Sequence, residues 1–122
     1  MSTVDWSEGI RTSLDDLPAV VATYLDAHRQ HDVATAISTF TADAAVTDEG
    51  HTYRGREEIG TWLGRAASQY TFTTDFTGAT TIGAAHVDVV AHLEGDFPGR
   101  VADLHFRFLL EGTSISRLVI EP

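Results

Sequence analysis

In the first half of the chain, hydrophobic positions recur at intervals of three and four residues, which is the spacing of one helix face. The pattern predicts a first helix that starts with Asp15 or Asp16 as N-cap, has Pro18 in its first turn and ends near Gln30. Its apolar face would consist of Leu17, Val20, Val21, Tyr24, Leu25 and His28.

Two further helices are predicted from the same spacing. Asp32 is a suitable cap for a short second helix. The apolar side of this helix would be Val33, Ala36, Ile37 and Phe40. A third helix should follow Gly55, because apolar residues recur there at i, i+3, i+4 and i+7. These residues are Ile59, Trp62, Leu63 and Ala66.

A small hairpin is predicted between the second and third helices. Residues 41–43 have the composition of a turn, and Ala44, Val46 and Asp48 then fall on one face of a strand, because side chains alternate along a strand. Glu49-Gly50 would turn the chain into a short return strand. Asp48 therefore places a carboxylate at the end of an apolar row, which makes it the first candidate for a functional residue.

After Gln69 the hydrophobic period changes to two, which is typical of β-strands. The expected strands are 70–76, 86–94, 103–111 and 114–120, with turns at 78–83, 95–99 and 112–113. Three helices, a hairpin and a four-stranded antiparallel run indicate an α+β fold, with a curved sheet wrapped on helices. Such a cone has an apolar interior, which is a natural site for a small hydrophobic ligand.

The 122 residues predict one domain at 15–122, preceded by an arm at 1–14. In the arm, Trp6 and Ile10 are spaced to form one helical turn packed as a flap, and a partly ordered arm is the alternative. The start of the chain lacks the features of a signal peptide, and no apolar run approaches the roughly 20 residues of a membrane helix. A cytoplasmic protein without membrane contacts is the expectation.

Composition and charge exclude several classes of function. The chain has no cysteine, so it has no disulfide, thiolate nucleophile or cysteine metal site. Its net charge is −10, which disfavours binding to nucleic acids and to anionic membranes. Among the six histidines, His86 and His92 share a strand face with Asp88 but lie about 20 Å apart at the usual strand rise. They cannot share one metal ion, and we predict a solvated or interface surface there, no metal site and no cofactor.

One pattern resembles a known family. The segments YLDAHRQHD, FTADAAVTDEG and YRG, an Ile and a Trp-Leu pair in the third helix, and the later LHFRF are similar to the nuclear-transport-factor-2-like superfamily. Within it, the SnoaL-like and ketosteroid-isomerase-like members are the most similar. The resemblance covers about residues 17–120. It implies a cone-shaped, cystatin-like fold and a homodimer formed through the outer face of the sheet.

The resemblance also implies roles for particular residues. Tyr24 matches a first-helix tyrosine that donates a hydrogen bond to a developing enolate, and Asp48 matches an aspartate that moves the proton. The protonated acid that completes the oxyanion hole is replaced by Leu104, with Asp103 one residue away, and a third-helix tyrosine is replaced by Leu63. These two departures argue against steroid isomerisation itself.

Two interpretations remain open from the residues alone. In an apolar cavity, the pKa of Asp48 would rise towards a range useful for proton transfer, and a tyrosine hydroxyl would stabilise an oxyanion. Alternatively, Asp48 bonds backbone amides of its turn and Tyr24 is a core residue. The first interpretation predicts isomerase or cyclase chemistry, and the second a non-catalytic dimeric ligand-binding or scaffold module. The remaining predicted pocket residues are Phe40, Val46, His51 (at the mouth), Trp62, Leu63, Leu104, Phe106 and Phe108.

Overall fold

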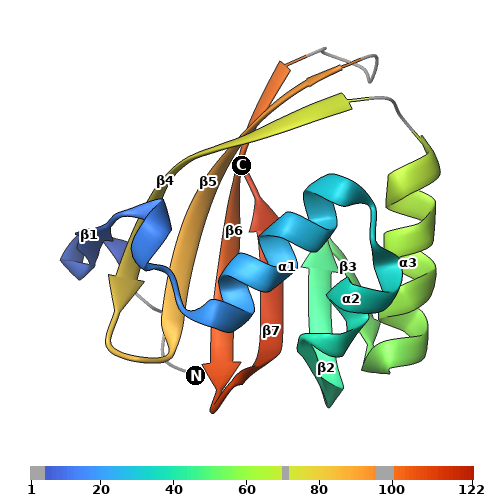
Figure 1. Ribbon diagram of the computed structural model, residues 1–122, viewed down its shortest axis with the longest axis horizontal. Helices are drawn as coiled ribbons and strands as arrows, with labels where there is room; N and C mark the ends of the chain where they lie inside the picture. The colour runs from blue at the N-terminus through green and yellow to red at the C-terminus, as the bar shows by residue number, and fades with distance from the viewer. Residues whose placement is uncertain (1–4, 70–71, 96–100) are drawn as a thin grey trace.

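Helices occupy one side of a curved sheet (Figure 1), and the computed structural model describes residues 5–69, 72–95 and 101–122. The α-helices are α1 (Ala19–Gln30), α2 (Val33–Ser38) and α3 (Gly55–Gln69), and the 3-10 helices are η1 (Trp6–Glu8) and η2 (Leu14–Asp16). The strands are β1 (Ile10–Thr12), β2 (Phe40–Asp48), β3 (His51–Arg54), β4 (Phe72–Ile82), β5 (His86–Gly95), β6 (Val101–Glu111) and β7 (Ser114–Glu121).

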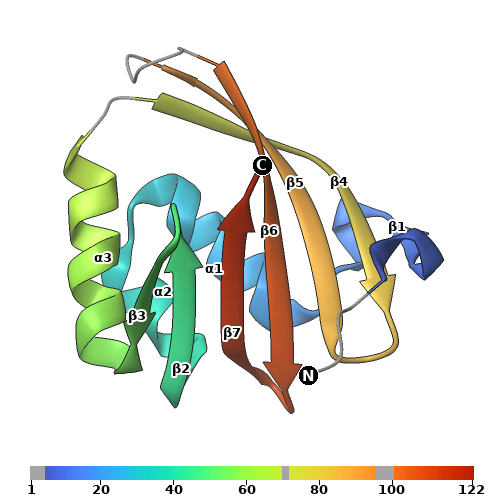
Figure 2. The ribbon, with the colours of Figure 1, turned by 180° about the vertical axis from the view of Figure 1, so that it is seen from behind.

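Across the described ranges, the seven strands form one sheet in the order β1-β4-β5-β6-β7-β2-β3. The β2–β7 pair is parallel and the other pairs are antiparallel. The views from the two sides show the sheet bending around α1, with α2 and α3 beside it (Figures 1 and 2). The predicted α+β class, with a curved and mostly antiparallel sheet on helices, is confirmed.

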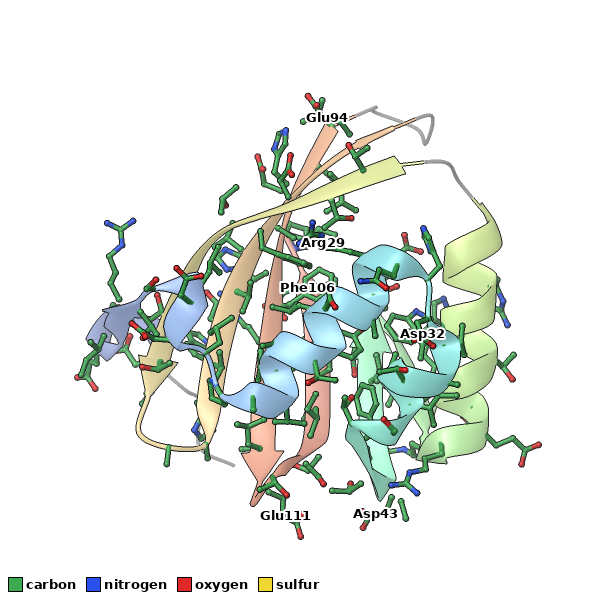
Figure 3. The ribbon with its side chains drawn as sticks, in the orientation of Figure 1. Arg29, Asp32, Asp43, Glu94, Phe106 and Glu111 are labelled. Carbon is green, nitrogen blue, oxygen red and sulfur yellow. The ribbon has the colours of Figure 1, made fainter. Side chains whose placement is uncertain are left out.

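The core lies between α1 and the concave face of the sheet. Alternate positions of the strands supply its apolar side chains, as strand geometry requires. Figure 3 shows Phe106 between α1 and the sheet, and this side chain is buried. The largest fully buried side chains are Tyr24, Phe40, Phe106, Phe108, Ile59, Ile115, Leu118, Val21, Val46, Val87 and Val89.

The start of α1 differs from the prediction. Asp15 and Asp16 lie in η2, which Ser13 caps by accepting a hydrogen bond from the Asp15 amide, and α1 begins only at Ala19. Leu17 is extended, with φ −65° and ψ 150°. A residue that precedes proline is disfavoured from helical geometry, so Pro18 separates the two aspartates from the helix. The predicted end at Gln30 and the Asp32 cap of α2 are confirmed.

Strand β2 starts earlier than predicted. Phe40 is not part of the second helix but is the first residue of β2, where it pairs with Ile115 of β7. Residues 41–43 are strand and not a turn, and the register shifts between Phe40 and Ala45. This irregularity accommodates residues of turn type within a strand. The Glu49-Gly50 turn is confirmed, and both residues have positive φ (52° and 79°), as the favoured two-residue hairpin turn requires.

Strand β4 also contains a register shift. Gly78 was expected to open a turn, but it lies within the strand at a register shift that follows Phe76, and the actual turn contains Gly83. Glycine inside a strand is typical of such a bulge. Tyr70, the expected turn at 96–99, and the side chains of Ala66 and Phe72 fall outside what the structure describes.

The N-terminal segment lies against the sheet. Ile10 belongs to β1, an edge strand that pairs with β4, and it does not share a helical turn with Trp6. The Trp6 ring meets the His86 ring edge-on at 6.3 Å and lies 5.5 Å from the Arg107 guanidinium carbon. This contact fixes Trp6 on the convex face of the sheet, opposite to α1.

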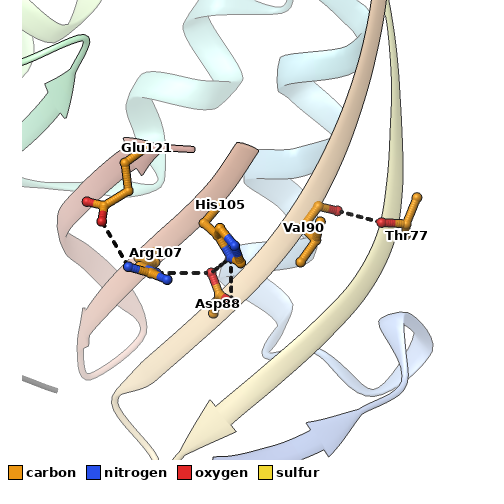
Figure 4. Close-up of polar contacts among 6 residues, drawn as sticks. All are labelled: Thr77, Asp88, Val90, His105, Arg107 and Glu121. Carbon is orange, nitrogen blue, oxygen red and sulfur yellow. Dashed lines mark hydrogen bonds and ion pairs between the residues drawn. The ribbon is translucent and has the colours of Figure 1, made fainter. Parts of the chain in front are cut away.

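The convex face carries a polar cluster (Figure 4). Asp88 is only 5% exposed, so of the two predicted alternatives, a solvated or an interface surface, the solvated one is wrong at this position. Its carboxylate contacts His105 Nδ1 at 2.9 Å and Arg107 Nε at 3.5 Å, and Arg107 Nη1 donates to Glu121 at 2.9 Å. The burial is tolerated because the carboxylate has both a cation and a hydrogen-bond partner.

Metal-binding clusters and membrane-spanning helices are both absent from the described residues. No cluster of three or more histidine, aspartate or glutamate side chains there is arranged to hold a metal ion. None of the helices in the same ranges has the length and apolar character needed to cross a membrane.

Candidate functional site

Two rows of residues, each paired across neighbouring strands, cross the concave face of the sheet. We call them the lower row and the upper row. The lower row is Val46, Leu118, Phe108 and Val87, taken from β2, β7, β6 and β5. The upper row, two positions away on each strand, is Asp48, Ile120, Phe106 and Val89. All of these residues are buried and apolar except Asp48, which is partly buried. Asp48 therefore ends an apolar row along β2, as predicted, and also ends the apolar row that runs across β5, β6 and β7 to β2.

Asp48 is held from the third helix. The indole Nε1 of Trp62 donates a hydrogen bond to Asp48 Oδ2 at 3.0 Å. Trp62 is itself buried and stacks on Tyr53 of β3, with ring centroids 6.0 Å apart. Because α3 packs against β2 and β3, the indole is fixed before any ligand arrives.

The environment of Asp48 raises its pKa above the usual carboxyl value. Burial is the largest cause, and the nearby charge of Glu49 acts in the same direction. The Trp62 hydrogen bond, the backbone amide of Glu49 and the charge of His51 favour the ionised form and oppose the rise. Asp48 therefore combines the turn contact of one interpretation with the buried carboxylate of the other.

Replacing Trp62 with phenylalanine should raise the pKa of Asp48 further. The substitution removes the only N–H donor of that side chain but keeps an aromatic ring, so the ionised carboxylate loses a stabilising hydrogen bond. Carbon-detected NMR titration of the Asp48 carboxyl measures the shift. Trp6→Phe is the matched control on the opposite face of the sheet and should leave the titration unchanged; an unchanged titration in Trp62→Phe would contradict the account.

Tyr24 lies at the level of the lower row. It is 0% exposed, and its ring meets Phe40 at 5.5 Å and Phe108 at 5.6 Å, both edge-on. Its hydroxyl lies 3.5 Å from His28 Nδ1. Burial, with a further contribution from the charge of Asp48, raises the pKa of Tyr24 well above its usual range. The phenol therefore stays protonated and can act only as a neutral hydrogen-bond partner.

His28 was predicted only as part of the apolar face of the first helix, and the structure adds it to the candidate site. Its ring meets Phe106 of the upper row edge-on at 5.3 Å, and its side chain is only partly buried. Burial, assisted by His31, lowers the pKa of His28 to about 4. The available signal was its position four residues after Tyr24, which places both side chains on one helix face.

The other predicted pocket residues divide into two groups. Phe40, Val46, Trp62, Leu63, Phe106 and Phe108 are buried members of the core. Leu104 keeps partial exposure and packs against the core, while His51 is exposed as the cross-strand partner of Asp48.

Asp103 lies on the convex face, where it bonds His92 Nδ1 at 2.6 Å. No bulge brings this carboxylate inside, so Leu104 occupies the inward position, as its place in the strand pattern predicted.

A groove runs between α1 and β4. Its volume is about 320 Å³, and it is lined by Leu14, Leu17, Ala22, Leu25, Asp26, Arg29, Asp75 and Phe76. The Phe76 ring also contacts Phe106, with centroids 6.1 Å apart. Phe76 is therefore shared between this groove and the upper row of the interior.

Comparisons with known proteins agree with this architecture. A protein of Sinorhizobium meliloti that is proposed to be a polyketide cyclase is 30% identical, with a TM-score of 0.83 over 90% of this chain and 100% of that one. The chain belongs to the nuclear-transport-factor-2-like superfamily, among its SnoaL-like and ketosteroid-isomerase-like members. The resemblance seen in the sequence is thereby confirmed.

Two more distant solved structures share the fold. A Catenulispora acidiphila protein with a ketosteroid-isomerase-like fold, in complex with trimethylamine, is 22% identical with a TM-score of 0.75, over 86% of this chain and 85% of that one. A Mycobacterium tuberculosis protein in complex with estradiol-17beta-hemisuccinate is 11% identical with a TM-score of 0.70, over 83% and 88%. Neither models of protein families nor curated proteins match the sequence. The superfamily name therefore describes the fold and leaves the reaction to be argued from the site.

Proposed function

We propose that this SnoaL-like protein binds a hydrophobic, oxygenated small molecule in its cone and carries out isomerase or cyclase chemistry with Asp48 as the acid/base. One observation carries the proposal: the upper row has a single carboxylate at the end of an otherwise apolar, buried series. Burial raises the pKa of that carboxyl, and a fixed indole N–H holds it in place. A structural turn aspartate has no need of either feature.

The chemistry follows from the two states of this carboxyl. As a carboxylate, Asp48 removes a proton from a carbon next to a ligand carbonyl, and the electron pair of the broken C–H bond moves onto the carbonyl oxygen. As a carboxylic acid, it returns the proton to another carbon, and the carbonyl is restored. A pKa nearer to neutral makes the carboxylate a stronger base for the first step while a useful fraction of it stays ionised. The negative oxygen formed between them requires a hydrogen-bond donor. Proton transfer of this kind needs no cofactor.

The related structures support the class of ligand. The Mycobacterium tuberculosis protein binds a steroid ester, and the Sinorhizobium meliloti protein is proposed to act on polyketides, which are likewise oxygenated and largely apolar. In this chain, the partly exposed inner residues Phe76, Leu93 and Leu104 pack against the core. They would give such a ligand an apolar surface beside the upper row.

A second candidate is a non-catalytic dimeric module that binds a ligand passively or serves as a scaffold. The full burial of Tyr24, Phe40 and Phe108 favours it, because side chains fill the lower part of the cone. Leu104 favours it as well, since it leaves the predicted third acid out of the interior. A homodimer through the convex face belongs to both candidates as a proposal, and so does a cytoplasmic location.

A ligand screen distinguishes the two candidates. The chain has two tryptophans, and their indole N–H signals in a proton–nitrogen NMR spectrum report on opposite faces of the sheet. Phenols and fused-ring ketones added in turn should shift the Trp62 indole and the amides near Asp48, but not the Trp6 indole. Shifts restricted to the convex face, or none with any compound, would contradict acid/base chemistry and favour the scaffold.

A further inference from the structure

We propose that His28 is the group that donates a hydrogen bond to the oxygen of the ligand, and that Tyr24 is a positioning residue that fixes the tautomer of His28. This inference rests on the proposed function and assigns the donor which that chemistry requires. It also changes the role that the family resemblance implied for Tyr24.

The positions of Tyr24 and His28 relative to the lower and upper rows support this assignment. Tyr24 contacts Phe108 in the lower row, and His28 contacts Phe106 in the upper row. One step of four residues along α1 rises about 6 Å, which matches two residues along a strand. Asp48 belongs to the upper row, so the α1 ring at its level is that of His28, and the Tyr24 hydroxyl extends from the lower level to contact His28 Nδ1.

The sheet separates the two groups by a distance comparable to the length of a small cyclic ligand. Asp48 and Phe106 are separated by one intervening strand, β7, which places their backbones about 10 Å apart along the sheet. The His28 ring lies against Phe106 at 5.3 Å. A cyclic ligand lying on this row would therefore have a base at one end and an imidazole at the other.

Exposure distinguishes the two candidate donors. Tyr24 is 0% exposed, and its hydroxyl already contacts His28. His28 keeps part of its surface exposed on the same helix face. His28 is thus more accessible to a ligand oxygen than Tyr24, whose ring packs against Phe40 and Phe108.

Tyr24 determines which imidazole nitrogen carries the proton. In the proposed arrangement the phenol donates across its 3.5 Å contact with His28 Nδ1, so that Nδ1 accepts and the hydrogen of the neutral ring lies on Nε2. Burial and the neighbouring His31 keep the ring uncharged at neutral pH by lowering its pKa to about 4. Among the described residues, the ionisable groups near this imidazole include Tyr24 on α1 and His31 at the C-cap of that helix, with Asp48 at the same level of the sheet. A neutral imidazole N–H donor can stabilise a developing enolate.

This arrangement explains how the site could work without an acid at Leu104. The inward acid that the resemblance implied on β6 is absent, and its task of hydrogen bonding the oxyanion passes to an imidazole on α1. The donor then approaches from the helix side of the cone, above Phe106, while the base remains on β2.

The test uses 2-naphthol as a ligand with a hydroxyl and naphthalene as its matched counterpart without one. His28→Leu should weaken the binding of 2-naphthol about 10-fold, as expected for one lost hydrogen bond, and leave naphthalene unchanged. His28→Gln retains an N–H donor and should recover most of the affinity for 2-naphthol. Binding is followed by fluorescence, and far-ultraviolet circular dichroism checks the fold of each variant.

The nitrogen NMR spectrum of histidine-labelled protein provides a readout that needs no ligand. His28 should show the Nε2–H tautomer at pH 7, and Tyr24→Phe should convert it to a mixture of the two tautomers. A charged ring, or an Nδ1–H tautomer in the wild type, would overturn the inference. Equal affinity of His28→Leu and wild type for 2-naphthol would overturn it while leaving the pocket in place. Failure of both compounds to bind the wild type would overturn the proposed function itself.

Discussion

Replacing Asp48 with asparagine should lower the rate of proton transfer by about 10²- to 10⁴-fold, which is the usual contribution of a positioned acid/base group. Asparagine has nearly the same shape, and its carbonyl oxygen can still accept the Trp62 indole hydrogen. The fold is therefore expected to persist while the proton carrier is lost. The conversion of a β,γ-unsaturated cyclic ketone to its conjugated isomer, followed by ultraviolet absorbance, measures the effect.

Asp103→Asn is the matched control for this experiment. Asp103 is also a strand aspartate, but its carboxylate lies on the convex face in contact with His92. Its replacement should leave the rate within a factor of about two, since it touches no part of the proposed site. Equal rates for the wild type and Asp48→Asn would remove Asp48 from the reaction.

The pH dependence of the wild-type rate follows from the same group. The step that removes the proton needs the ionised carboxylate, so the rate should fall as the pH drops through the pKa of Asp48. Because burial raises that pKa, the decline should begin at a higher pH than for an ordinary aspartate.

The second large effect should be on stability. Phe108→Ala is expected to lower the free energy of unfolding by about 3–5 kcal/mol, through lost apolar burial and the cavity left behind. Phe108 is 1% exposed, occupies the lower row and supports the Tyr24 ring. Urea denaturation followed by circular dichroism measures the change.

Ile10→Ala provides the comparison for Phe108. This side chain is also hydrophobic and belongs to a strand of the same sheet, but it is 73% exposed. Its removal should change the unfolding free energy by no more than about 0.5 kcal/mol. A loss below about 1 kcal/mol in Phe108→Ala would show that the lower row is not the packed base of the cone.

Local periodicity was sufficient for much of the fold. The end of α1, the cap of α2, the turn at Glu49-Gly50 and the strands β5, β6 and β7 all follow from spacing and turn chemistry. The predictions are wrong where a contact distant in sequence, or a neighbouring residue, determines the secondary structure. Phe40 joins β2 because it pairs with β7, which is more than seventy positions away in sequence. Gly78 stays in β4 because β5 continues beside it.

The candidate site, like the fold, could be predicted from local sequence only in part. Alternation along β2 was enough to single out Asp48, but its bond to Trp62 depends on how α3 packs on the hairpin. The helical pattern placed Tyr24 and His28 on one buried face. Which of them lies level with Asp48 depends on how α1 is positioned along β6, and no local pattern specifies that position.

The pKa of Asp48 tests the central claim most directly. A carbon-detected NMR titration of the carboxyl groups, with Asp48→Asn used to assign the signal, measures it in the free protein. The account predicts a pKa above the usual 3.8 that moves when a ligand occupies the cone. A pKa at or below that value, unaffected by phenols and fused-ring ketones, would make Asp48 a turn residue and contradict the account.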